Sequence, residues 1–181
     1  MIFETERLII REFTRDDVDS TQRYGGDPEN MYFMGWGPND RAATAEFVER
    51  KLADQAEDPR REYDMAICLR ETGEHIGSVG LTVDANRTSG ELGWILRKDM
   101  WRNGYTTEAA HALMRFGFEQ LGLHRITARC NADNTASYRV MEKLRMRREA
   151  HFRSACYERV GDRKEWTDEL VYAMLKTEWI D

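Results

Sequence analysis

The stretch that most constrains this chain is a turn at residues 101–106, with the sequence Trp-Arg-Asn-Gly-Tyr-Thr. A strand-like apolar pattern at residues 90–97 precedes it, an amphipathic helical pattern at residues 104–121 follows, and a second strand-like pattern covers residues 124–130. Two strands joined through a helix form a parallel pair with a right-handed crossover. We therefore expect a mixed sheet with helices on its faces.

The same turn has the features of a phosphate-binding site. The first amides of a helix have no partner within the helix and carry the positive end of its dipole, so a loop leading into them can hold a pyrophosphate. Gly104 permits close approach of backbone and ligand. A plain connection between a strand and a helix can have the same sequence, so the hexamer alone leaves both interpretations open.

The remaining patterns predict an α/β fold around this unit. Short turns indicate antiparallel pairing of consecutive strands, and Gly122 is expected to end the long helix. The further strands are expected at residues 7–13, 63–70 and 75–84, and helical or turn-helical segments at residues 14–24, 27–34 and 40–56.

Length and composition predict one domain over residues 1–181. The chain has no linker-like stretch, no internal repeat and no apolar run near the roughly 18 residues that span a membrane. No secretory signal is visible, and three cysteines without metal-like spacing suit a reducing cytoplasm. The net charge of -6 argues against nucleic acid as a partner and is compatible with a cationic amine substrate.

Several ordered segments resemble one family, the GCN5-related N-acetyltransferases (GNAT). The segment after the second strand, residues 131–144, reads Asn-Ala-Asp-Asn-Thr-Ala-Ser-Tyr-Arg-Val-Met-Glu-Lys-Leu, and residues 5–11 read Thr-Glu-Arg-Leu-Ile-Ile-Arg. Together with residues 65–69 and 75–81, which resemble the central hairpin, and residues 168–175, which resemble the final strand, they are similar to the branch of ribosomal-protein N-terminal acetyltransferases (RimJ/RimL-like). This resemblance implies a mostly antiparallel sheet in which the parallel pair at residues 90–97 and 124–130 splays apart.

The resemblance also implies the chemistry. Relatives transfer an acetyl group from acetyl-CoA directly to a primary amine, either a protein N-terminal α-amine or a small molecule, in a ternary complex. The family's phosphate motif departs here at its first and last positions, but main-chain amides do most of the binding. The residues implied to bind the cosubstrate are Leu96 and Lys98 through their backbone, on pantetheine, and Trp101, Arg102, Asn103, Gly104, Tyr105 and Thr106 around the pyrophosphate.

Asn134 reads as a helix N-cap, with Ser137 at the third helical position. In relatives the residue at Asn134 also bonds pantetheine, and the residue at Ser137 lies near the CoA sulfur. Many relatives protonate the leaving thiolate with a Tyr at the position of Met141, which cannot do so. Ser137 is therefore our candidate donor to the leaving sulfur, and Tyr138 is expected to face away.

The general base is left open between two glutamates. Glu91 lies near where some relatives place a catalytic glutamate, but it could equally be an edge charge at a strand start. In the ribosomal-protein branch a glutamate comes from the strand after the 134–144 helix. The matching position here is Cys156, with Glu158 two residues on and on the same strand face. Cys156 lacks a visible His partner and is expected to be structural rather than a nucleophile.

Trp36, between two glycines, either walls the acceptor pocket, as in relatives, or covers a small core. The four histidines are scattered, so no metal site is expected. The alternative to an enzyme is an acyl-CoA-binding sensor without turnover. A dehydrogenase-type nucleotide-binding domain is excluded, because this sequence lacks the glycine motif of that class. The sequence leaves the acceptor and the oligomeric state open, with a homodimer as one option.

Overall fold

A computed structural model describes residues 1–180. The strands are β1 (Ile2–Glu4), β2 (Leu8–Glu12), β3 (Glu62–Leu69), β4 (His75–Val83), β5 (Ser89–Leu96), β6 (Arg125–Asn131), β7 (Arg147–Val160) and β8 (Arg163–Leu175). The helices are α1 (Val18–Gly25), α2 (Arg41–Gln55), α3 (Tyr105–Arg115) and α4 (Thr135–Lys143). Short turns of helix are η1 (Arg15–Asp17), η2 (Lys98–Met100), η3 (Phe116–Gln120) and η4 (Lys176–Glu178).

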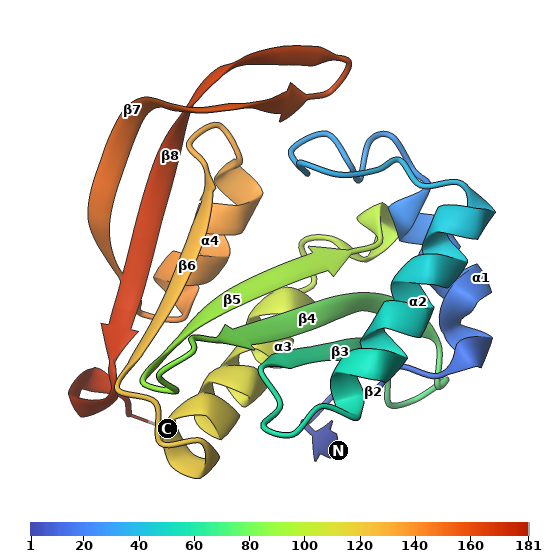
Figure 1. Cartoon of the computed structure of the whole chain (residues 1–181), viewed down its shortest axis with the longest axis horizontal. Coiled ribbons are helices and arrows are strands. Elements are labelled where there is room, and N and C mark those ends of the chain that lie inside the picture. Colours follow the sequence, from blue (N-terminus) through green and yellow to red (C-terminus); the bar gives the residue numbers. More distant parts are fainter. Residues whose placement is uncertain (181) are drawn as a thin grey trace.

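All eight strands form one sheet in the order β1-β2-β3-β4-β5-β6-β8-β7. Neighbouring strands are antiparallel except β5 and β6, which are parallel. The mixed sheet, the antiparallel β3–β4–β5 meander and the parallel crossover are therefore confirmed. The strand after the 134–144 helix and the final strand, both implied by the resemblance, form the long β7–β8 hairpin. Figure 1 shows its tip turning toward the connection between α1 and α2.

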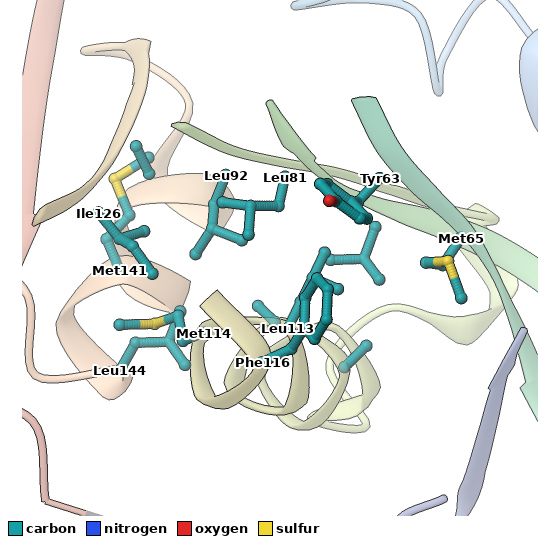
Figure 2. Packing of buried hydrophobic residues seen from close by; sticks show 14 of the residues in the cluster. Tyr63, Met65, Leu81, Leu92, Leu113, Met114, Phe116, Ile126, Met141 and Leu144 are labelled. Carbon is teal, nitrogen blue, oxygen red and sulfur yellow. The ribbon is translucent and has the colours of Figure 1, made fainter. Parts of the chain in front are cut away.

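The helices form two layers on the sheet (Figure 1). One layer, α1 and α2, lies over β2–β4, and a small core of Phe13, Val48, Ala66 and Cys68 fills the space below α2. The other layer consists of α3 and α4. Here the main core joins the sheet to both helices, as Figure 2 shows for residues including Leu81, Met114, Ile126, Met141 and Leu144.

The helix expected at residues 104–121 is regular only as far as Arg115. The next five residues, Phe116–Gln120, form a π turn, and Gly122 ends the segment with a φ of +70°. A Cβ at Gly117 would lie 2.8 Å from Ile126 Cδ1 and 3.1 Å from Leu81 Cδ2. The wide turn thus presses its glycine against the sheet while Phe116 and Phe118 are both buried.

The parallel pair splays apart. Pairing runs only from Ser89↔Arg125 to Leu92↔Ala128, although both strands continue beyond it. Because the Arg97 amide donates to Ile76 on β4 at 2.9 Å, the alternating backbone groups of Leu96 point the other way, toward β6. The splay expected from the resemblance is therefore present. Among residues 1–180, no helix has the length and apolar character needed to cross a bilayer.

Candidate active site

The turn before α3 exposes a run of unpaired amides. Gly104 is the N-cap of α3 with a φ of +82°, and Arg102 is also left-handed with a φ of +64°. The neighbouring carbonyls are occupied: Asn103 Nδ2 donates to the oxygens of Met100 and Trp101, each at 3.2 Å. Within residues 1–180, the backbone N–H groups of residues 102–106 have no hydrogen-bond partner. Such a nest at a helix N-terminus fits a pyrophosphate.

The end of β5 is already bonded by side chains. The Leu96 carbonyl accepts from Asn30 Nδ2 at 2.7 Å and from Trp101 Nε1 at 2.6 Å. The Lys98 amide donates to Asn30 Oδ1 at 3.1 Å. Asn30 is buried, so it holds both backbone groups that the sequence assigned to pantetheine. Pantetheine at these two groups must compete with Asn30, whereas the Leu96 N–H faces the splay.

At the start of α4, Asn134 caps the helix as expected, because its Oδ1 accepts from the Ser137 amide at 3.1 Å. Burial raises the pKa of the Cys130 thiol on β6 to about 11, against the opposing effect of the Ser137 side chain, so the thiol stays protonated. The expectation for Tyr138 was wrong, because its ring packs against the main core rather than facing away.

Glu91 belongs to a charged group on the opposite face of the sheet. Its Oε2 accepts from Arg129 Nη2 at 2.8 Å and from Nε at 3.1 Å. Arg129 also approaches Glu169 Oε1 at 3.7 Å. Glu91 is thus more than an isolated edge charge, because it forms one end of a row that crosses β5, β6 and β8.

Glu158 of β7 lies on the same face of the sheet, near Asn131 at the end of β6. Its Oε1 accepts from Thr167 Oγ1 at 2.7 Å and from Asn131 Nδ2 at 3.1 Å, and both donors are buried. Desolvation and the negative charges of Glu169 and Glu158 raise the pKa of the Cys156 thiol. A thiol that resists ionisation is a poor nucleophile, which supports a structural role for Cys156.

The candidate catalytic residues therefore lie on opposite faces of the sheet around β6. Ser137 and Cys130 lie on the α3–α4 side, whereas Glu91 and Glu158 project from the other side, since adjacent strand residues alternate in direction. The splay beyond Leu92↔Ala128 opens between these sides. A thioester held on one side and an amine on the other could meet there.

Trp36 lies in the connection between α1 and α2. Its ring stacks on Phe47 of α2 at 6.2 Å, and 38% of its surface stays exposed. The carbonyl of Trp36 accepts from Arg159 Nη2 at 2.9 Å, and the Gly161 amide donates to the Tyr32 carbonyl at 2.8 Å. The tip of the β7–β8 hairpin is thus tied to this connection. The stacking on α2 favours the core-covering alternative, although Trp36 stays partly exposed.

Comparison with known proteins decides the family. The model of the acetyltransferase (GNAT) domain matches residues 7–147. The chain belongs to the GCN5-related N-acetyltransferase family. This acetyltransferase is 34% identical over 179 residues to the uncharacterized N-acetyltransferase YnaD of Bacillus subtilis (strain 168), covering 99% of each chain.

Solved structures agree. A GNAT-family acetyltransferase from Bacillus anthracis superposes with a TM-score of 0.86 at 32% identity, over 98% of this chain and 100% of that one. RimL, a ribosomal L7/L12 alpha-N-protein acetyltransferase in complex with coenzyme A, has the same fold, with a TM-score of 0.83 at 16% identity over 97% and 98% of the chains. The predicted GNAT fold and the enzyme class are confirmed.

Sequence reasoning missed the residues that hold the two glutamates. Residues 125–131 alternate between polar and apolar, which is a visible sign of one polar face. Which polar residues lie opposite Glu91 and Glu158 depends on the register of β6, β8 and β7. The missed residues are Arg129, which pairs with Glu91, and Asn131 and Thr167, which donate to Glu158. Glu169, which approaches Arg129, was missed as well. No group of three or more potential metal ligands occurs within residues 1–180.

Proposed function

We propose that this acetyltransferase moves an acetyl group directly from acetyl-CoA to a primary amine in a ternary complex. The observation that carries the proposal is the run of unpaired amides at residues 102–106, at the N-terminus of α3 and beside the splay. A pyrophosphate bound to these amides would direct the pantetheine arm toward Leu96 and Asn134. The thioester would then reach Ser137.

The acceptor side has a surplus of negative charge. Three carboxylates, on Glu91, Glu158 and Glu169, share one face with the guanidinium of Arg129. Such a face favours a cationic acceptor over an anionic one. It supports an amine as the acceptor class, and Trp36 is the proposed wall of this side.

Attack requires a neutral amine, so a base must first remove a proton. We assign this role to Glu158, because its two neutral donors, Thr167 and Asn131, stay in place when the carboxylate is protonated. Protonation of Glu91 would instead break its ion pair with Arg129. One oxygen of Glu158, Oε2, has no partner within residues 1–180 and can accept the proton.

Glu158 first takes one proton from the ammonium group of the acceptor. The neutral amine nitrogen then attacks the thioester carbon, a C–N bond forms and the C–S bond breaks. The second proton on nitrogen passes to the leaving thiolate, which departs as the free CoA thiol after accepting a hydrogen bond from the Ser137 hydroxyl. The raised pKa values of the Cys130 and Cys156 thiols give no support to an acetyl-cysteine intermediate.

The test measures donor binding and turnover separately. Acetyl-CoA at 100 times its dissociation constant should stabilise the fold by about 2.7 kcal/mol, and a panel of amines should release free CoA thiol. Replacement of a general base should lower the rate about 100-fold at neutral pH and be partly rescued as pH rises toward the amine pKa. We expect this profile for Glu158→Gln and not for Glu91→Gln.

Ser137→Ala should lower turnover about 10- to 1000-fold with acetyl-CoA affinity unchanged, because its hydrogen bond forms mainly in the transition state. Binding without turnover of any amine would leave an acyl-CoA-binding module instead of an enzyme. Absence of a thermal shift with millimolar acetyl-CoA would remove the cosubstrate itself.

A further inference from the structure

The loop between β1 and β2 contacts the first turn of α3, about a hundred residues later in the sequence. Glu108 Oε1 accepts from Thr5 Oγ1 at 2.6 Å and from the Arg7 amide at 2.9 Å. Glu108 Oε2 accepts from Arg7 Nε at 2.7 Å, and a second guanidinium nitrogen, Nη2, lies 2.7 Å away. One carboxylate thus takes four contacts from two residues of the loop. We call Thr5, Arg7 and Glu108 the clamp.

The clamp reaches the phosphate turn itself. Arg7 Nη1 donates to the Asn103 carbonyl at 2.9 Å, and the guanidinium lies 4.7 Å from the ring centre of Tyr105. A Cβ built on Gly104 would lie 3.4 Å from Arg7 Nη2. Arg7 therefore bridges the turn at Asn103 to the helix at Glu108, and it lies against the backbone between them.

Apolar packing does not hold this turn. Residues 101–103 are exposed, and a groove of about 820 Å³ runs beside Gly104 between the β1–β2 loop and α3. Burial alone would raise the pKa of Glu108, but bonds from Thr5 and Arg7 outweigh it and lower the pKa. The carboxylate is therefore ionised at neutral pH and attracts Arg7 continuously.

We propose that Arg7 and Glu108 are positioning residues for the cosubstrate: they fix the left-handed turn at residues 102–104 so that its amides converge on the pyrophosphate. The inference rests on the proposed use of acetyl-CoA. Preorganised amides bind an anion without first having to be ordered, so a loose turn should weaken donor binding and leave the chemical step intact.

Variants of Glu108 and Arg7 distinguish the clamp from a purely electrostatic effect on acetyl-CoA binding. Glu108→Gln removes a negative charge near the phosphate site, so a purely electrostatic role predicts tighter binding of acetyl-CoA. The clamp predicts the opposite, because the amide of Gln cannot accept at both positions that face Arg7. We expect KM for acetyl-CoA and the Kd of CoA to rise about tenfold in Glu108→Gln and Arg7→Gln, with kcat within about twofold of the parent.

The matched control is Arg70→Gln. Arg70 is 45% exposed, like Arg7 at 44%, and is ion-paired to Glu4 of β1 without touching the turn. Arg70→Gln should leave KM and Kd unchanged. Arg7→Lys keeps the charge but cannot span Asn103 and Glu108 together, so it should behave like Arg7→Gln.

Four outcomes overturn the clamp: tighter binding in Glu108→Gln, parental values in Arg7→Gln, the same loss in Arg70→Gln, or a fall in kcat without a rise in KM. Calorimetry with CoA tests the clamp even where no amine is turned over. If the parent itself binds no CoA, the proposed function has failed and the clamp with it. If the parent binds CoA and the variants bind it equally well, only the clamp has failed.

Discussion

The two halves of the sheet differ in what covers them. Strands β2, β3 and β4 have helices over both faces, and four consecutive residues of β3, Met65, Ala66, Ile67 and Cys68, are buried (Figure 1). Strands β6, β8 and β7 have α4 on one side, whereas most of β7 is exposed. Strands covered on both faces read as continuous apolar runs, and half-covered strands alternate.

Polar groups follow the same division. In the covered half, Asp17 is buried and both its oxygens are bonded by Arg11 at 2.7 Å. In the half-covered region, Glu91 and Glu158 each keep one oxygen without a partner within residues 1–180. A buried polar group must be permanently satisfied, whereas a group facing solvent can exchange partners during a reaction. Chemistry is therefore expected in the half-covered region.

The largest effect on stability should come from the core of the covered half. Leu81 of β4 is 1% exposed and packs against Gly117 of the π turn. Leu81→Ala should therefore lower the free energy of unfolding by about 2–5 kcal/mol through the cavity it leaves. Trp166 on β8 is 64% exposed, and Trp166→Ala should change the free energy of unfolding by less than about 0.5 kcal/mol. Urea titration of both variants measures the difference. Similar losses would show that the hairpin is part of the same core.

An intermediate effect should distinguish the ion pairs of the two regions. Burial would raise the pKa of Asp17, but bonds from Arg11, His75 and Thr14 hold it well below its usual value. Asp17→Asn should cost about 3 kcal/mol because it leaves Arg11 without its carboxylate. Glu178→Gln, which breaks the exposed pair with Arg147, should cost less than about 1 kcal/mol.

The contribution of the Asp17–Arg11 pair to stability should depend on pH, because the pKa of Asp17 is lowered in the folded protein. A carboxyl with a lowered folded-state pKa stabilises the fold above its unfolded pKa of about 3.9, and that contribution is lost as pH falls below it. The gap between the parent and Asp17→Asn should therefore be constant from neutral pH to about pH 5 and shrink below pH 4. Chemical denaturation at several pH values checks this, and a constant gap down to pH 2 would contradict it.

The smallest effect concerns the turn where the two halves meet. Arg102 has a φ of +64°, a conformation that costs a non-glycine residue about 1 kcal/mol. Arg102→Gly relieves this strain but adds freedom to the unfolded chain, so we expect a net gain of about 0.5 kcal/mol, or about 1–2 °C in Tm. Differential scanning calorimetry measures the shift. A lower Tm would mean that the Arg102 side chain contributes more than its backbone strain costs.

The sequence by itself determined the elements and the family. Apolar periodicity located β3, β4, β5, β6 and α3, because burial against one layer imposes a period of two on strands and 3.6 on helices. The glycine of the 101–106 turn and the cap at Asn134 were equally readable, since they depend on local backbone geometry. The Thr5-Glu-Arg and Asn134-to-Leu144 segments indicated the GNAT family before any contact was known.

Only the tertiary structure decided which side chains act together. Glu158 meets Thr167 and Asn131 through the registers of two strand pairs, and Glu108 meets Arg7 across about a hundred residues. Asn30 reaches the end of β5 from the connection between α1 and α2. No local pattern encodes such distant pairs, because a side chain's partner depends on how whole elements pack. The sequence thus specified the elements of the site, and packing decided which of its residues meet.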